Sequence, residues 1–246
     1  MLILDLLKSM DIEIPVKESD YLYNGIVVPR VTKILSAMLH EDTLMNWSNA
    51  IGLYKRQRYK DEMNKASTIG TNTHNFIEEY INKQSYDIKT ASTYNIDEIK
   101  AIDNGVQSFI LWYDIVCSNN DVKILGMEQH LSCPWYGGTY DLLIQINDKI
   151  YLVDFKTSNH IGVRYFYQLA AYKYMLELQG IIIDGAIILQ VDKKTPSFEE
   201  YVLDLHNPVH KNFMDACTRC FFSLVYAYYN RIYTENMFKS VFGKKG

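Results

Sequence analysis

The chain has 246 residues, a length that suits one large domain. Hydrophobic residues make up 48% and charged residues 22%, a balance that permits a sizeable core. The formal net charge of −4 argues against a protein that coats nucleic acid through an overall basic surface, although a local basic strip could still contact phosphates.

Helical periodicity dominates the first half of the chain. Asn24-Gly25, between apolar flanks, predicts a β-hairpin turn. Thr32 is suited to be the N-cap of a helix over residues 33–39. Longer helical patterns cover residues 2–10, 41–82 and 96–118. We expect Gly52 and Gly70 to interrupt the second pattern, with a new helix opening at Gly70.

The pattern changes in the segment 122–156, which is rich in β-branched and aromatic residues. Breaks at Pro134, Gly137-Gly138 and Asn147-Asp148 predict three antiparallel strands in this segment. Beyond it we expect a helix, two strands and a closing helix, over residues 165–179, 181–191, 198–205 and 210–236. The expected fold is α/β, with a central mixed β-sheet that contains an antiparallel meander and is flanked by helices.

We expect a single domain over residues 1–246. Its parts would be a mainly helical N-terminal part, a catalytic sheet core and a C-terminal helix, over residues 1–120, 121–205 and 206–246. No stretch approaches the roughly 20 apolar residues of a membrane span, and residues 1–10 lack the features of a signal peptide. A soluble, cytoplasmic protein is therefore expected.

Two aspartates of the meander are predicted to face each other. If Asn147 and Asp148 form a two-residue turn, Asp141 lies opposite Asp154 and both side chains project to one face. Opposed like charges destabilise a sheet unless a cation lies between them. Because Mg²⁺ and Mn²⁺ prefer oxygen ligands, the pair predicts a divalent metal site.

Lys156 is expected on the same face, two residues beyond Asp154. The other face of this strand carries a core-like set, Tyr151, Val153 and Phe155. Two carboxylates and an ammonium group suit phosphodiester hydrolysis, in which a metal activates water and the lysine stabilises developing charge. A surface salt bridge would also explain a lone D-x-K, but it gives no reason for the register of Asp141.

Helical residues could complete the site. His74 would add an imidazole ligand, and Glu78, four residues later on the same face, could orient its ring. Gln168 and Tyr172 lie four apart on a later helix and could hold a DNA phosphate or brace the strand of Lys156. Ordinary helix hydrogen bonding and packing are the alternative interpretation of these four residues.

Glu128 lies on the strand before the Gly137-Gly138 turn and could face the site, where it would order Lys156 or a second metal ion. By alternation, His130 and Ser132 share its face. A basic run could contact the DNA backbone or form a solvated face: Lys55, Arg56, Arg58 and Lys60.

Four motifs occur in order along the chain: GxxxH at 70–74, GTxD at 138–141, DxK at 154–156 and QxxxY at 168–172. This set resembles the RecB-like branch of the PD-(D/E)xK nuclease superfamily. The segments 28–35 and 44–47, with Gly52, are similar to the N-terminal part of phage-type exonucleases and of the mitochondrial genome-maintenance exonuclease in that branch.

The resemblance implies a restriction-endonuclease-like core and a Mg²⁺- or Mn²⁺-dependent exonuclease, with one or two ions. Such enzymes trim DNA ends, often single-stranded ones, in replication, recombination or repair, where protein partners are expected. By match, the metal ligands would be His74, Asp141, Asp154 and the carbonyl of Phe155. Lys156 would be the catalytic lysine. Asp141, Asp154 and Glu128 join it in the expected catalytic set, and Gln168, Tyr172 and Thr157 form the substrate-contacting set. The resemblance also suggests a phage origin.

The cysteines depart from part of this family. Some relatives hold an iron–sulfur cluster with one Cys ahead of GxxxH and three after QxxxY. Cys217 and Cys220 match one pair, but no Cys precedes His74 and no third Cys follows Tyr172, so no cluster is expected. A zinc ribbon would need a second CxxC, so we interpret this pair as reduced thiols on one helix face.

Two other functions remain open. One is a structure-specific endonuclease on the same fold. The other is a catalytically inactive, nuclease-derived DNA-binding or inhibitor protein, although such proteins usually lose a metal ligand or the lysine.

Overall fold

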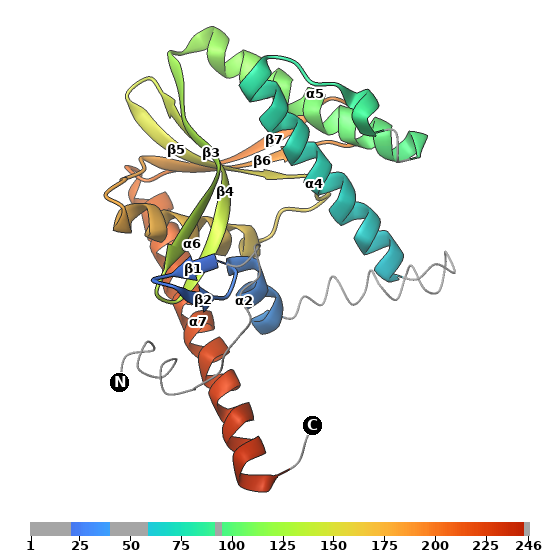
Figure 1. Ribbon diagram of the computed structural model, residues 1–246. Helices are drawn as coiled ribbons and strands as arrows, with labels where there is room; N and C mark the ends of the chain where they lie inside the picture. Colours follow the sequence, from blue (N-terminus) through green and yellow to red (C-terminus); the bar gives the residue numbers. More distant parts are fainter. Residues whose placement is uncertain (1–20, 40–58, 92–94, 244–246) are drawn as a thin grey trace.

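The computed structural model describes residues 21–39, 59–91 and 95–243, and its centre is a five-stranded sheet (Figure 1). The strands are hydrogen-bonded in chain order: β3 (Val122–Cys133), β4 (Tyr136–Ile146), β5 (Lys149–Lys156), β6 (Gly185–Val191) and β7 (Phe198–Asp204). β5 and β6 are parallel, and the other neighbours are antiparallel. The predicted mixed sheet with an antiparallel meander is confirmed.

The β4–β5 hairpin has the predicted register. Asn147 adopts a left-handed φ of 55° in the two-residue turn, a conformation that Asn tolerates well. Ile146 pairs with Lys149, and Leu142 pairs with Val153. The residue numbers of each pair in this ladder add up to the same value. Asp141 and Asp154 therefore face each other one step beyond the last pair.

Helices cover both faces of the sheet (Figure 1). One face is covered by α4 (Tyr59–Lys83) and α5 (Ile96–Asn119), and the other by α6 (Val163–Leu178), α7 (Pro208–Phe242) and α2 (Val31–Met38). Strand alternation divides the apolar side chains between two cores. Val153 and Phe155 pack in the core that contains Phe109 of α5, whereas Leu152 packs in the core that contains Leu169 of α6.

A small hairpin of β1 (Tyr21–Tyr23) and β2 (Ile26–Val28) lies beside the end of β3 and the start of β4 (Figure 1). Its turn is the predicted Asn24-Gly25, in which both residues have positive φ, 50° and 79°. The amide of Gly137 donates to the carbonyl of Pro29 at 3.0 Å, which ties the segment after β2 to the start of β4.

Two helix starts differ from the predictions. α2 begins at Val31, so Thr32 lies inside the helix and is not its N-cap; the fully buried Val31 side chain accounts for the earlier start. α4 runs without interruption through Gly70, which therefore does not open a helix. An ideal Cβ at Gly70 would lie 3.3 Å from Thr157 Oγ1, so the close approach of helix and strand explains the glycine better than a chain break does.

Other element boundaries shift by a few residues. β6 begins at Gly185, later than the expected 181, and α7 continues to Phe242, beyond the expected 236. The expected helix over residues 2–10, and the part of the 41–82 pattern before residue 59, lie outside the described residues. Within the described ranges, no helix combines the length and apolar character that crossing a membrane requires.

Candidate metal centre and active site

The site begins where the β4–β5 ladder ends. Beyond the pair Leu142–Val153, the amide of Phe155 donates to Asp141 Oδ2 at 2.6 Å. The side chain of Asp141 therefore replaces a strand-to-strand contact and is held in one orientation. Both aspartates are buried, with 7% of Asp141 and 1% of Asp154 exposed. Burial of two neighbouring carboxylates is costly without positive charge nearby.

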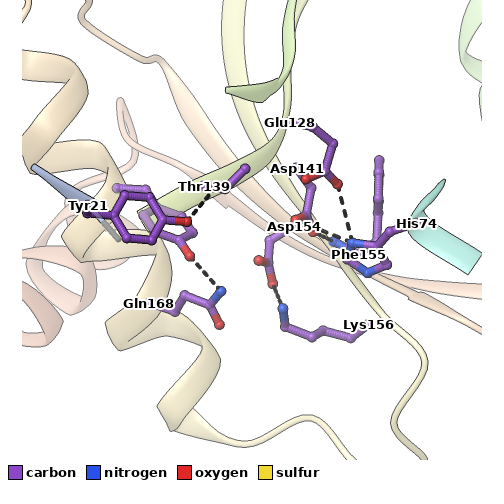
Figure 2. A network of polar contacts seen from close by, with 10 residues as sticks. Tyr21, His74, Glu128, Thr139, Asp141, Asp154, Phe155, Lys156 and Gln168 are labelled. Atoms are coloured by element: carbon purple, nitrogen blue, oxygen red, sulfur yellow. Dashed lines mark hydrogen bonds and ion pairs between the residues drawn. The ribbon is translucent and has the colours of Figure 1, made fainter. Parts of the chain in front are cut away.

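His74 brings one such charge from α4. Its Nδ1 lies 3.4 Å from Asp141 Oδ1 and 3.5 Å from Glu128 Oε1, and its ring meets the ring of Phe155 edge-on at 5.6 Å (Figure 2). The structure therefore brings the predicted His74, Asp141 and Glu128 together, although they come from three different elements. Glu128, predicted to order Lys156 or a second metal ion, contacts His74.

Glu128 has an unusual backbone. Its φ is 46°, a left-handed conformation inside β3. Such a conformation in a non-glycine residue costs roughly 1–3 kcal/mol and is concentrated at functional sites. It also breaks the alternation on which the predicted shared face depends. His130 and Ser132 instead contact the β1–β2 hairpin, through the ring of Tyr21 and the carbonyl of Leu22.

Lys156 supplies a second positive charge. Its Nζ lies 2.5 Å from Asp154 Oδ2 and 5.2 Å from the centre of the Tyr165 ring. This contact engages Oδ2, whereas Oδ1 is buried and has no hydrogen-bond partner among the described residues. One oxygen of the carboxylate therefore keeps acceptor capacity that the described chain does not use.

The charges at this site are strongly coupled. Burial lowers the pKa of His74, but Asp141 and Glu128 outweigh burial and raise this pKa to about 10. Burial works to raise the pKa of Asp141, yet the charge and hydrogen bond of His74 hold it below its usual value. A protonated His74 thus offsets part of the negative charge of Asp141 and Glu128.

The second pair behaves differently. Burial raises the pKa of Asp154 to about 6; Lys156 opposes this shift and Asp141 adds to it. Burial works to lower the pKa of Lys156, but the two aspartates hold it above its usual value. Lys156 is therefore a charged ammonium group at neutral pH, in a site largely shielded from water.

The cluster fits a divalent cation. One ligand atom each from His74, Glu128 and Asp141 lies within 4.8 Å of the others. Ligand atoms that share a cation at bond lengths of about 2.1 Å are about 3–4 Å apart, and the two contacts of His74 fall in this range. Two carboxylates and one imidazole could hold a divalent cation. Asp154, also predicted as a ligand, does not belong to this group and pairs with Lys156.

The residues of QxxxY adjoin the site from α6. Gln168 Nε2 donates to the hydroxyl of Tyr172 at 3.0 Å, and both side chains are buried. An ideal Cβ at Gly138 would lie 2.6 Å from Cε1 of Tyr172, so the glycine of GTxD makes room for the tyrosine of QxxxY. Burial, with added repulsion from Asp154 and Asp141, raises the pKa of Tyr172 well above its usual value.

Two residues near the site had no predicted role: Tyr21, and Thr139 of the GTxD motif. The Tyr21 hydroxyl lies 2.6 Å from Thr139 Oγ1 (Figure 2), and Thr139 is two residues before Asp141 on β4. Alternation along β4 could have identified Thr139. Nothing in the sequence near Tyr21 indicates where the hairpin packs.

Several predicted residues lie apart from the cluster. Glu78 forms no hydrogen bond or ion pair with the described chain, and Glu128 and Asp141 hold the His74 ring instead. Thr157 lines a neighbouring groove. Cys217 is buried and Cys220 is exposed, both as free thiols. The side chains of the basic run over residues 55–60 lie outside the described residues.

Comparison with known proteins gives only distant similarity. No family model and no curated protein matches the chain. The alkaline exonuclease LHK-Exo from Laribacter hongkongensis is similar at a TM-score of 0.30 and 13% identity, over 52% of this chain and 68% of that chain. Its complex with dAMP has a TM-score of 0.30 and 13% identity, over 52% of this chain and 67% of that chain. The protein designated SSO0001 has a TM-score of 0.27 and 13% identity, over 63% of this chain and 85% of that chain.

Proposed function

We propose that this protein is a divalent-metal-dependent DNA nuclease. The supporting observation is the convergence of His74, Glu128 and Asp141 within 4.8 Å, next to the buried ion pair of Asp154 and Lys156. A structural salt-bridge network does not account for the strained backbone of Glu128 or for the buried, unpartnered Oδ1 of Asp154.

Each residue has a role in this proposal. His74, Asp141 and Glu128 would hold the ion, with Asp154 and the carbonyl of Phe155 as further ligands. A bound Mg²⁺ or Mn²⁺ would lower the pKa of water and neutralise phosphate charge. The Phe155 amide fixes Asp141, so that this carboxylate needs little reorganisation.

Lys156 would stabilise the negative charge that develops on the phosphate, and Asp154 keeps its ammonium group charged and in place. In the reaction, the water oxygen forms a bond to phosphorus, the phosphorus–oxygen bond to one sugar breaks, and a proton passes to the departing oxygen. Gln168, Tyr172 and Thr157 are proposed to contact the substrate.

The order of the GxxxH, GTxD, DxK and QxxxY motifs supports a finer proposal. On this basis the enzyme is an exonuclease that acts at DNA ends, with a preference for single strands, in replication, recombination or repair. Mg²⁺ and Mn²⁺ are the proposed cofactors.

The test uses 5′- and 3′-labelled single- and double-stranded oligonucleotides, with closed circular DNA alongside. We expect cleavage of the linear substrates with Mg²⁺ or Mn²⁺ and none with EDTA. Cleavage of closed circles would identify an endonuclease. DNA binding without any cleavage would identify an inactive binding protein and contradict the proposal.

Matched variants assign the activity to the site. Lys156→Ala should abolish cleavage, whereas Lys149→Ala, at the other end of β5, should retain it. Asp141→Asn should likewise be inactive, whereas Asp148→Asn, in the exposed β4–β5 turn, should remain active. Equal activity of Lys156→Ala and Lys149→Ala would remove Lys156 from the mechanism.

A further inference from the structure

A polar groove of about 510 Å³ begins one residue beyond Lys156. It lies at the carboxyl ends of the parallel strands β5 and β6, the end of such strands where ligands usually bind. One wall is the segment after β5, and the other is the turn between β6 and β7. The lining residues are Thr157, Ser158, Asn159, Gln190, Val191, Asp192, Lys193, Lys194, Ser197, Phe198 and Glu199.

The β6–β7 turn is held from behind by α5. The side-chain amide of Asn104 donates to the carbonyls of Lys193 and Lys194, at 2.9 and 2.8 Å. The Ser108 hydroxyl accepts from the amide of Ser197 at 3.0 Å, and its oxygen lies 3.1 Å from the carbonyl of Asp192. Since three hydrogen bonds from α5 side chains fix the backbone, the two lysines are presented by a preorganised turn.

The wall after β5 is connected to β6 through Gln190. Gln190 pairs with Lys156 across the parallel strands, and its amide donates to the carbonyl of Ser158 at 2.6 Å. The groove is therefore a continuation of the surface that carries Lys156.

Lys193 and Lys194 supply the positive charge of the groove, and Asp192 and Glu199 supply its negative charge. Neither Lys193 nor Lys194 forms an ion pair with a carboxylate of the described chain. The two acidic residues of the lining are engaged: Asp192 Oδ1 accepts the amide of Lys194 at 2.6 Å, and Glu199 accepts the Tyr201 hydroxyl at 2.9 Å. Burial lowers the pKa of Lys193; Asp192 opposes this shift, and Lys194 adds to it by a smaller amount. A phosphate would add a counter-charge beside the two ammonium groups.

We propose that this groove binds the phosphodiester backbone of a single DNA strand next to the bond that is cleaved, with Lys193 and Lys194 as phosphate contacts. This proposal rests on the proposed nuclease function. Lysine contacts to phosphates release counterions, which makes the affinity depend on salt. Contacts that lie outside the metal centre should matter only for a strand long enough to reach them.

The test measures binding of a fluorescent thymidine oligonucleotide of about 20 residues in EDTA, over a series of salt concentrations. Loss of two phosphate contacts should reduce the slope of log affinity against log salt by about 1.4, at roughly 0.7 per contact for single strands. The double variant Lys193→Ala/Lys194→Ala is compared with Lys123→Ala/Lys149→Ala. This control removes two lysines near the starts of β3 and β5, away from the groove. Lys193→Arg/Lys194→Arg should keep the wild-type slope. An unchanged slope in the alanine variant of the groove would overturn the proposal.

Cleavage separates this proposal from the nuclease function. The groove variant should raise the KM for the long oligonucleotide and leave the cleavage of a dinucleotide unchanged. If the wild-type protein cleaves DNA and the groove variant behaves identically on both lengths, the groove proposal fails while the nuclease stands. If the wild-type protein cleaves nothing, the nuclease proposal fails, and the salt slopes alone still decide whether the groove binds the strand.

Discussion

Replacement of Gly138 by alanine would place a methyl group against the buried ring of Tyr172. The ideal Cβ position lies 2.6 Å from Cε1 of this ring and 3.3 Å from its Cζ and hydroxyl oxygen. Ordinary carbon contacts are about 3.5–4 Å, so the ring or the strand must move by about 1 Å. Tyr172 is only 3% exposed and is hydrogen-bonded to Gln168, which leaves the ring little room.

Overpacking of this kind typically costs about 1–3 kcal/mol. Removing a glycine from a strand returns about 0.5–1 kcal/mol through the unfolded state, which is smaller than the steric cost. We therefore expect Gly138→Ala to lower the free energy of unfolding by about 1–2 kcal/mol, or Tm by about 2–8 °C for a chain of this length. Denaturant unfolding in the absence of metal measures the effect independently of activity.

A shortened side chain provides the control. In the Tyr172→Leu background the methyl group meets no aromatic ring, so Gly138→Ala should become neutral or stabilising. The two substitutions should therefore show a coupling free energy of about 1 kcal/mol or more in a double-mutant cycle. An equal cost of Gly138→Ala in both backgrounds would show that the clash with Tyr172 is not the cause.

Three further predictions concern metal and pH. Mn²⁺ at about 100 times its Kd should stabilise the protein by about 2.7 kcal/mol in thermal unfolding, and Asp141→Asn should abolish this gain; a gain that persists would place the ion elsewhere. With a pKa of about 10, His74 must lose a proton to bind metal, so titration calorimetry in several buffers at pH 7 should detect about one released proton, with affinity that rises with pH. Hydrogen bonds from the Ile150 amide and from His206 lower the pKa of Asp184 in the folded protein. Asp184 therefore stabilises the fold at pH values above its pKa in the unfolded chain, and this stabilisation is lost as the pH falls through its pKa in the folded protein. In Asp184→Asn the free energy of unfolding should thus fall less steeply as the pH drops below about 4. An unchanged pH dependence in the variant would exclude this contribution.

Local sequence determined the central hairpin of the sheet and the acidic pair that it carries. The two-residue turn at Asn147-Asp148 fixes the register, and the alternation of strands then places Asp141, Asp154 and Lys156. Both rules act between residues that are close along the chain or directly opposite each other. Helix α5 was predicted within about one residue for a similar reason, because its apolar spacing is regular. The structure adds a capping box between Asn95 and Glu98 at its start.

Only the tertiary structure decided how distant segments complete the site. Helical periodicity places His74 on a face of α4 but does not say which strand that face meets, and the rotation of Glu128 toward it depends on a left-handed backbone that residue type does not predict. The low helix propensity of glycine predicts a break at Gly70. The helix α4 nevertheless continues through Gly70, because its close packing against Thr157 favours a residue without a side chain. Contacts such as these arise from packing between surfaces that are far apart in sequence. For that reason the contacts of His74 with Glu128 and Asp141 became visible only in the folded chain.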